Sequence, residues 1–332
     1  SPIIPEGKED RYRIVQLIGR NSRTMVHQAY DRSRGEVVVL KLVRKEETGS
    51  PFADRFLGKA MQLQEAVHPS LIPVLDVGTL GGSPYFTMEY EEGRSLERRI
   101  REGGDSPLEA ARTLEEAATA LGSLHREGLC HGNIKSANLF FTRDDKARFS
   151  DLGLREGVSD FVPPERVGKA SGAPDIRGDV YSLGVVLYEM LTGNLPFEAV
   201  PREGLEKVIL GRFPRAPREV DENIPVDLEA ICLRAIEKDP LMRYGSAEEF
   251  SGDLRRFLEG VPVLSRPRST VSRMVRGVRR FRRRMMTAGI LLVAGVVAGY
   301  FALGGWGGSD SPGDPTGSED ARAEAEPFLL EA

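Results

Sequence analysis

Cysteine and histidine are scarce in this sequence, and its charge is nearly balanced. Of the 332 residues, two are cysteine and four are histidine. Cys130 and Cys232 stand in apolar surroundings without the spacing of metal ligands, so we expect buried free thiols in a reducing compartment rather than a zinc site or a disulfide framework. The formal net charge of −4 argues against nucleic acid as the main partner.

Acidic residues are absent from one stretch near the C-terminus, where nine Arg and no Asp or Glu lie between Arg266 and Arg284. Residues 285–304 then carry no charge, and about 20 helical residues rise about 30 Å, the thickness of a bilayer core. We therefore expect one transmembrane helix over residues 285–306. Because arginine marks the cytoplasmic side of a span, the sequence predicts a single-pass protein of the cell membrane with its large domain in the cytoplasm.

The segments on either side of this span differ in charge. Residues 261–284 form a basic juxtamembrane linker, whose arginines we expect to contact the lipid bilayer. Residues 307–332 contain seven acidic residues and one Arg, and they predict an acidic, disordered tail outside the cell. Gly295 and Gly299 form a G-x-x-x-G pattern within the span, which would allow two membrane helices to pack closely in a homodimer.

The large domain changes its pattern along its length. After an N-terminal tail at residues 1–10, residues 11–46 predict antiparallel strands, residues 54–67 a helix, and residues 71–78 and 84–90 further strands. From residue 107 the pattern is helical, with a long buried helix, short strands at 138–141 and 147–150, and helices at 179–191, 227–237 and 247–258. These elements predict an α+β domain over residues 11–260, with a β-rich N-lobe and a helical C-lobe.

One segment carries most of the chemical information. Residues 130–139 place His131, Asn133, Lys135 and Asn138 in a fixed spacing. Other motifs follow in order along the chain: Leu17-Ile18-Gly19, Leu40-Lys41, His68-Pro69, Met88-Glu89-Tyr90, Asp151-Leu152-Gly153, Pro163-Pro164-Glu165, Asp179 to Gly184, and Asp239-Pro240 with Arg243. In this order they resemble the bacterial, eukaryotic-like (Hanks-type) transmembrane serine/threonine protein kinases, and the match spans residues 11–260.

The resemblance implies a two-lobed protein-kinase-like fold with ATP and Mg²⁺ as cofactors. It implies catalytic positions at Lys135 and at Asn133, which stands where the family has its proton-accepting Asp. It implies metal binding by Asn138 and Asp151. The residues that it implies for nucleotide binding are Ile18, Gly19, Val26, Val39, Lys41, Glu89, Tyr90 and Phe140.

Two departures from the family pattern bear directly on catalysis. Asn133 can orient a hydroxyl group, but it cannot accept its proton at neutral pH. Lys59 stands where the family has the helix glutamate that positions Lys41, so one of the two lysines must turn outward or lose its proton. Gln62, one turn further along the helix, is then the residue expected to accept a hydrogen bond from Lys41.

The family's glycine-rich loop is also altered. Of its pattern, residues 19–26 keep only Gly19 and Val26. Asn21 can adopt a left-handed conformation, and Arg20 and Arg23 can supply positive charge in place of glycine. The alternative is a strand turn that has lost its phosphate role. Val39 replaces the alanine that lies against adenine, and its two extra methyl groups would crowd a nucleotide.

The C-lobe departs less from the pattern, and the resemblance implies structural roles there. These are hydrogen bonds from the catalytic-loop backbone to Asp179, a buried ion pair between Glu165 and Arg243, and an apolar column of Leu63, Val74, Leu152 and His131. The activation segment, Asp151 to Glu165, has only 15 residues and one hydroxyl group, that of Ser159. Gly132 also replaces the Arg that would bind an activating phosphate, so regulation by phosphorylation of this segment is not expected.

Three functional hypotheses follow. In the first, the chain is a membrane-anchored pseudokinase with weak or no phosphotransfer, which acts as a signalling scaffold for an unknown cytoplasmic protein. In the second, it is an active serine/threonine kinase that transfers the γ-phosphate of ATP to protein hydroxyls with non-standard residues. In the third, which overlaps the first, it is a switch that binds ATP without transferring phosphate, as the retained Lys41, Lys135, Asn138 and Asp151 allow.

Overall fold

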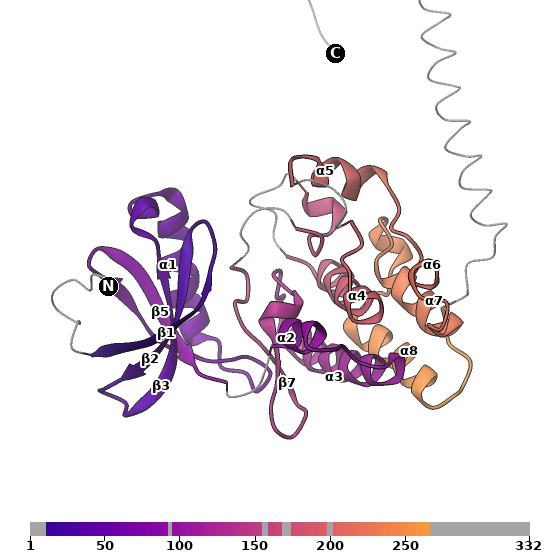
Figure 1. The fold of residues 1–332 in the computed structure, drawn as a ribbon, viewed down its shortest axis with the longest axis horizontal. Helices are drawn as coiled ribbons and strands as arrows, with labels where there is room; N and C mark the ends of the chain where they lie inside the picture. The colour runs from indigo at the N-terminus through magenta and orange to yellow at the C-terminus, as the bar shows by residue number, and fades with distance from the viewer. Residues whose placement is uncertain (1–10, 92–94, 155–158, 168–173, 198–201, 266–332) are drawn as a thin grey trace, which may run out of the picture. The chain divides into compact units, whose positions relative to one another are not determined.

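The computed structural model describes residues 11–91, 95–154, 159–167, 174–197 and 202–265 (Figure 1). By its internal contacts the chain divides into two units, Ser1–Pro267 and Arg268–Ala332. The predicted transmembrane helix at 285–306 and acidic tail at 307–332 lie outside the described residues, as does the linker from residue 266 onward. Within the described ranges, no helix combines the length and the apolar composition that a membrane crossing requires.

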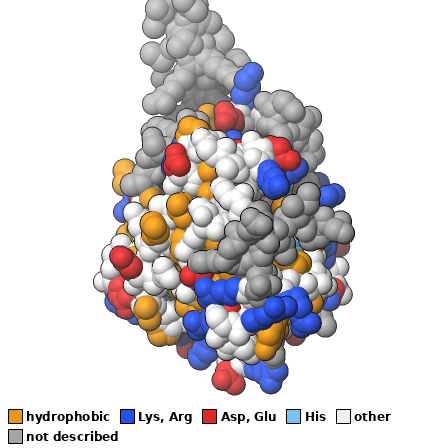
Figure 2. All heavy atoms as spheres, turned by 90° about the vertical axis from the view of Figure 1, so that its left-hand side faces the viewer, with side chains coloured by type: hydrophobic (Ala, Val, Ile, Leu, Met, Phe, Trp, Pro, Cys, Tyr) orange, Lys and Arg blue, Asp and Glu red, His pale blue; other side chains and the backbone are white. Residues whose placement is uncertain are grey.

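The N-lobe is built on one antiparallel sheet of five strands in the order β1-β2-β3-β5-β4. Figure 1 shows this sheet with helix α1, Pro51–Glu65, beside it. The strands of the sheet are β1 Tyr12–Arg20, β2 Thr24–Asp31, β3 Glu36–Val43, β4 Val74–Leu80 and β5 Ser83–Glu89. The predicted strands over residues 11–46, 71–78 and 84–90 are therefore confirmed. Seen from the sheet end (Figure 2), Lys and Arg side chains spread over the lower part of this face, with hydrophobic side chains scattered among them.

Helix α1, Pro51–Glu65, is the helix of the N-lobe and corresponds to the one predicted over 54–67. It begins where the Ser50 side chain accepts a hydrogen bond from the backbone of Ala53 and a proline fills the first turn. Its apolar side buries Phe52, Phe56 and Leu63. Phe56 packs on Phe86 of the sheet with ring centroids 5.2 Å apart, which fixes the helix against the strands and so positions Lys59 on its cleft side.

The C-lobe is helical, as predicted (Figure 1). Its helices are α2 Leu96–Arg101, α3 Pro107–Arg126, α4 Ile176–Thr192, α5 Arg202–Gly211, α6 Pro217–Val220, α7 Val226–Ala235 and α8 Ala247–Leu258; β6 Leu139–Phe141 and β7 Ala147–Phe149 form a short antiparallel pair. Helix α3 begins with a reciprocal capping box between Ser106 and Glu109. Helix α4 is buried along most of its length and forms the centre of this lobe.

The predicted apolar column joins the two lobes. Leu63 of α1 and Leu152 belong to the same hydrophobic cluster, and Val74 packs against it. His131 is fully buried, and its ring lies 5.3 Å from that of Phe149. Burial lowers the pKa of His131 to about 4, so this side chain is neutral near pH 7 and serves as a packing residue.

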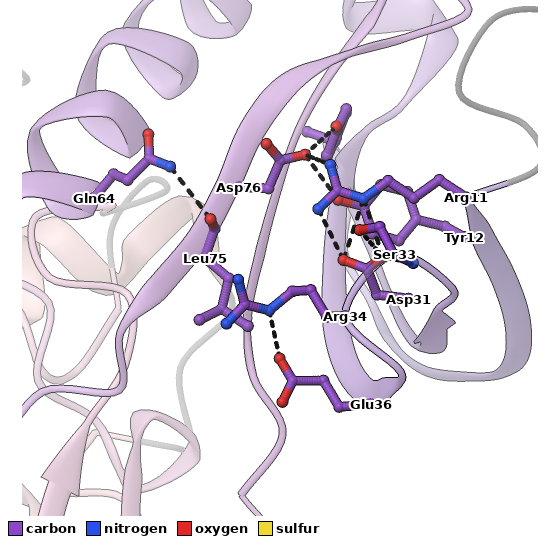
Figure 3. A network of polar contacts seen from close by, with 10 residues as sticks. Arg11, Tyr12, Asp31, Ser33, Arg34, Glu36, Gln64, Leu75 and Asp76 are labelled. Carbon is purple, nitrogen blue, oxygen red and sulfur yellow. Dashed lines mark hydrogen bonds and ion pairs between the residues drawn. The ribbon is translucent and has the colours of Figure 1, made fainter.

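A network of polar side chains lies in the N-lobe (Figure 3). The Asp76 carboxylate accepts hydrogen bonds from the hydroxyls of Tyr12 at 2.7 Å and Tyr85 at 2.6 Å, and from the guanidinium of Arg11 at 3.0 Å. Arg11 also donates to Asp31, which has no solvent exposure. The network ties the residue before β1 to strands β2, β4 and β5, and so holds both edges of the sheet.

The Asp31 carboxylate makes this network sensitive to acid. Burial alone raises its pKa, but hydrogen bonds from Arg11 and Ser33 outweigh burial and lower the pKa to about 2. Because the folded pKa lies below the unfolded one, the pair stabilises the fold above about pH 4 and loses this effect as the pH falls toward 2. We expect the Tm difference between the wild type and Asp31→Asn to shrink from pH 6 to pH 3. A constant difference would contradict this, and Asp144→Asn, at an exposed loop position, is the control.

Candidate functional site

The lysine of strand β3 forms an ion pair with the start of the activation segment. The Nζ of Lys41 lies 2.9 Å from Oδ2 of Asp151, and the two side chains are only 7% and 12% exposed. Asp151 has a left-handed backbone, with φ of 60°, which turns its carboxylate toward the sheet. The pair therefore connects the N-lobe directly to the C-lobe, and Lys41 has a carboxylate partner although helix α1 offers none.

Lys59 takes the place that the family gives to a glutamate, and it faces the cleft. Its side chain is half-buried and lies against Gly153. The two are so close that a Cβ atom on this glycine would collide with Cε of Lys59. Burial lowers the pKa of Lys59. The prediction that Gln62 accepts a hydrogen bond from Lys41 is wrong. The Oε1 atom of Gln62 lies 3.5 Å from Nζ of Lys59 instead.

Asn133, at the position of the family's base, acts as a hydrogen-bond donor. Its Nδ2 donates to the backbone oxygens of Asp151 and Leu154, at 3.1 Å each. Its backbone N–H donates to Nδ1 of His131 at 3.2 Å. An ionised carboxylate has no proton to donate, so an aspartate could not make either side-chain bond. Asn133 therefore ties the catalytic loop to the first residues of the activation segment.

The two predicted metal ligands lie next to this loop. Nδ2 of the buried Asn138 donates to the backbone oxygen of Asn133 at 2.9 Å, which leaves its amide oxygen to coordinate a cation. Oδ1 of Asp151 is buried and has no hydrogen-bond partner in the described part of the chain. Carboxylate and amide oxygens are the ligands that Mg²⁺ prefers, so this pair fits a magnesium ion.

The residues predicted to contact a nucleotide are only partly brought together. Val26, Val39, Tyr90 and Phe140 belong to or pack against one apolar cluster, which also contains Met88. Gly19 is paired with Val26 across β1 and β2, and Lys41 is bonded to Asp151 as above. Ile18 is 46% exposed at the surface of β1. The Glu89 carboxylate is occupied by Arg148, at 3.0 Å, which also reaches Glu91 at 2.8 Å and so ties the end of β5 to β7.

The altered glycine-rich loop is a tight turn between β1 and β2. Oδ1 of Asn21 accepts hydrogen bonds from the backbone N–H groups of Arg23, at 2.8 Å, and Thr24, at 2.6 Å. The side chain of Asn21 thus closes the turn. Its backbone is not in the left-handed conformation that the sequence allowed for it. The Arg23 guanidinium lies over the Phe52 ring, 5.0 Å from its centroid. This fits the interpretation of a strand turn better than that of a phosphate-cradling loop.

Helix α4 binds the backbone of the catalytic loop through Asp179, as the sequence predicted. Asp179 accepts hydrogen bonds from the backbone N–H groups of His131, at 2.7 Å, and Gly132, at 2.6 Å, and lies 3.0 Å from Nε2 of His125. Cys130 stands beside this group, and burial raises the pKa of its thiol to about 11. Cys130 and Cys232 are free thiols; Cys232 is buried, whereas Cys130 is partly exposed.

The predicted ion pair at the end of the activation segment is also present. Two nitrogen atoms of Arg243 donate to the two carboxylate oxygens of Glu165, at 2.7 Å each, and the Arg243 side chain is completely buried. A nearby contact was not predicted. Arg166 donates to the backbone oxygen of Gly132 at 3.2 Å, beside the place where the family's Arg is missing. In the sequence, Arg166 was marked only by its position directly after the Pro163-Pro164-Glu165 motif.

Gly132 is required by its backbone and by close packing. Its φ of 68° is unfavourable for residues with a side chain, and a Cβ atom there would lie 2.6 Å from Cβ of Pro174. An arginine at this position would therefore displace Pro174 or the guanidinium of Arg166. The loss of the family's arginine is built into the packing of this loop.

Comparison with known proteins identifies the family of this domain. Residues 12–253 match the family model of the protein kinase domain. The chain is 31% identical to a probable serine/threonine-protein kinase of Clostridium perfringens over 264 residues, and 31% identical to the serine/threonine-protein kinase PknB of Mycobacterium leprae over 279 residues. These matches cover 74% and 78% of this chain but only 38% and 44% of the two kinases.

A solved structure shows the same fold. The PknI kinase domain of Mycobacterium tuberculosis superposes with a TM-score of 0.60 at 20% sequence identity, covering 74% of this chain and 96% of that domain. The family match covers both lobes and contains every residue of the candidate site. This chain therefore belongs to the protein kinase family and is related to the Hanks-type serine/threonine kinases of bacteria.

Proposed function

We propose that the chain is a kinase-fold signalling module with weak or no phosphotransfer. One observation carries this proposal: Asn133, at the position of the base, donates two side-chain hydrogen bonds, and both go to backbone oxygens of the activation segment. An amide cannot take the proton of an attacking hydroxyl, and loss of a general base costs typically about 10²–10⁴ in rate. In its place the position has a structural contact.

The cation at the place of the helix glutamate supports the same proposal. In the family the β3 lysine is positioned by that glutamate. Here Lys41 is held by Asp151 at 2.9 Å, and Lys59 lies against Gly153. A Mg²⁺ ion at Oδ1 of Asp151 would share this carboxylate with Lys41, which holds Oδ2. We propose that the domain works by contacts with a cytoplasmic signalling protein, as a scaffold or a nucleotide-responsive switch.

Nucleotide and metal binding are compatible with this proposal. Asp151 and Asn138 offer the oxygen atoms that would hold Mg²⁺, and Lys41 and Lys135 would lie near phosphate groups. A bound Mg²⁺ ion would neutralise part of the phosphate charge. The apolar cluster with Val39 and Phe140 would take the base, although Val39, 8% exposed, leaves little room beside it.

An active serine/threonine kinase is the second candidate function. It is favoured by Oδ1 of Asp151, which has no hydrogen-bond partner among the described residues, and by the retained Lys135 and Asn138. It is also favoured by the relatives from Clostridium perfringens and Mycobacterium leprae, which are described as a probable serine/threonine-protein kinase and as the serine/threonine-protein kinase PknB. Because phosphoryl transfer depends mainly on positioning and charge stabilisation, these residues alone could sustain a slow reaction.

Membrane attachment is proposed from the sequence. The uncharged residues 285–304 follow the arginine-rich linker, and this order supports a single span with the kinase fold in the cytoplasm. In this proposal the linker arginines contact the lipid bilayer, and Gly295 and Gly299 pack two spans into a homodimer.

The test is transfer of ³²P from ATP by the full chain, to itself and to a generic protein substrate. We expect no transfer above that of the Asp151→Ala variant, which removes the metal ligand. Transfer by the wild type that Asp151→Ala abolishes would refute the pseudokinase proposal and establish the active kinase. Binding of Mg²⁺–ATP is read separately as a thermal shift, and a shift without transfer would identify the nucleotide switch.

A further inference from the structure

Three side chains that can bind a metal ion meet beside the catalytic loop. One ring nitrogen of His125, Sγ of Cys130 and one carboxylate oxygen of Asp179 all lie within 4.8 Å of one another. Among the described residues, this is the one group of three or more His, Cys, Asp or Glu side chains close enough to hold a metal ion. None of the three lines the cavity that Lys41 and Asp151 line, so the group is separate from the predicted magnesium site. Spacing along the chain did not indicate a metal site here, because Asp179 comes from helix α4 and is distant in sequence.

The turn at the end of helix α3 brings Cys130 back toward His125. Gly128 has a left-handed backbone, with φ of 77°, and its N–H donates to the backbone oxygen of His125 at 3.0 Å. The N–H of Leu129 donates to the backbone oxygen of Leu124, also at 3.0 Å. These are the two hydrogen bonds of a Schellman motif, which ends a helix and turns the chain back along it. Cys130, the next residue, therefore lies beside the last turn of α3.

The imidazole and the carboxylate of this group can release a proton to make room for a cation. Nε2 of His125 lies 3.0 Å from Oδ2 of Asp179, and the two side chains are only 5% and 1% exposed. Nδ1 of His125 is buried and has no hydrogen-bond partner in the part of the chain that the structure describes, so no second bond fixes which ring nitrogen carries the proton. With the proton on Nδ1, Nε2 is free to bind a metal ion. The backbone N–H groups of His131 and Gly132 still hold the Asp179 carboxylate in place.

The charges around Cys130 favour a bound cation over a reactive thiolate. Burial, together with the carboxylates of Asp179 and Asp175, raises the pKa of the thiol, and Arg166 acts in the opposite direction. A nucleophilic or redox-active cysteine needs the reverse, with positive charge beside it. A divalent metal ion suits these surroundings, because it displaces the thiol proton and pairs with the negative charges.

The ligand types point to zinc. Zn²⁺ binds thiolate sulfur at about 2.3 Å and imidazole nitrogen or carboxylate oxygen at about 2.0–2.2 Å, in a tetrahedron whose ligand atoms lie about 3.3–3.6 Å apart. The 3.0 Å between Nε2 of His125 and Oδ2 of Asp179 is close to this spacing, and the partly exposed Cys130 can turn toward them. The thiolate and the carboxylate together neutralise the charge of the ion. Water at the exposed side of Cys130 completes the tetrahedron.

We propose that His125, Cys130 and Asp179 bind one Zn²⁺ ion. The ion joins the last turn of α3, the residue before the catalytic His131 and helix α4, and so fixes the backbone of the catalytic loop on the C-lobe. This inference goes beyond the proposed function, since the site requires neither a nucleotide nor phosphotransfer.

The test is titration of the metal-free full chain with Zn²⁺ alone, in competition with a chromogenic chelator. At a free zinc concentration about 100-fold above the Kd, we expect a Tm higher by about 5–10 °C. Loss of a residue that only orients a ligand costs about 10–100-fold in metal affinity, so Cys130→Ser and His125→Gln, which each remove a ligand, should raise the Kd at least about 100-fold. The glutamine amide can still donate to Asp179, so His125→Gln keeps the contact that holds the fold. Co²⁺ bound in place of Zn²⁺ should show the charge-transfer absorption of a thiolate ligand, and Cys130→Ser should lose it.

Two controls separate this site from the rest of the chain. Cys232→Ser is the matched control, because Cys232 is the other free thiol and is fully buried on α7, where its Sγ lies 3.7 Å from the backbone oxygen of Gly184. This variant and Asp151→Ala, which removes the predicted magnesium ligand, should both leave the Kd for zinc unchanged. Absence of zinc binding, a Kd that stays the same in Cys130→Ser and His125→Gln, or an equal rise in Cys232→Ser would each overturn the proposal. A Co²⁺ complex of the wild type without thiolate absorption would overturn it as well, even if a variant failed to fold.

Discussion

Replacing Arg243 with alanine is expected to lower the free energy of unfolding by about 3–5 kcal/mol, because it breaks a buried ion pair by removing one partner. The guanidinium makes two 2.7 Å bonds to Glu165 and further bonds to the backbone oxygens of Glu237, Arg177 and Lys238. It also lies 4.9 Å from the centroid of the Tyr181 ring. The variant leaves a half-buried carboxylate and three carbonyl groups without their donor.

Urea unfolding of the full chain measures this effect against a matched exposed pair. Arg126 forms a 2.8 Å ion pair with Glu248, but its side chain is 64% exposed, so Arg126→Ala should cost less than about 1 kcal/mol. Glu165→Gln keeps the shape of the buried pair and removes only one charge, so its cost should lie between the other two. Equal losses for Arg243→Ala and Arg126→Ala would show that burial of the pair does not matter.

The sequence predicted the parts of the molecule that depend on pattern or on a fixed family position. Helix α8 has the predicted bounds, residues 247–258, because Ser246 caps its first turn and Phe250 and Leu254 fall on its buried side. The contacts of Asp179 and the Glu165–Arg243 pair follow from their positions in the motifs. Both contacts are determined once the fold is known, since the motifs place the donor and the acceptor side by side in it.

Contacts that depend on a choice between partners were not predictable from sequence. Lys41 had several possible partners in the cleft, and Asp151 was considered only as a metal ligand; the structure pairs them directly. Lys59 could turn outward or inward, and it turns toward Gly153, where the missing side chain leaves space. Such choices are made by side-chain packing after the two lobes meet, and spacing along the chain does not encode them.

Asn133 is the position where this difference matters most. From sequence it is a defective base, and its oxygen is the atom of interest. In the structure its nitrogen has the defining role, because it donates to two carbonyl groups of the activation segment at 3.1 Å. A substitution that looks like a repair in the sequence is therefore a disruption in the folded chain.

Asn133→Asp is accordingly expected to destabilise the domain and to restore no phosphotransfer. The carboxylate loses both donors and faces two carbonyl oxygens, at a cost of about 2–3 kcal/mol, or a Tm lower by about 4–10 °C. Asn133 and Lys135 line one cavity. The positive charge of Lys135 offsets part of the repulsion between the new carboxylate and the carbonyl oxygens, but it cannot replace the lost N–H donors. Thermal unfolding checks the stability, and ³²P transfer checks the activity.

The control for this prediction is Asn194→Asp, because the Asn194 amide also donates to a backbone oxygen, that of Thr192, at 2.8 Å, but in an exposed loop. Its effect should be less than half that of Asn133→Asp. Because nearby carbonyl groups raise the pKa of the new carboxyl above about 3.9, its destabilising effect should be full near pH 7 and should diminish as the pH falls through about 5 to 4, where the group regains a proton to donate. A Tm equal to that of the wild type, together with new phosphotransfer, would mean that position 133 is a lost base and not a structural contact.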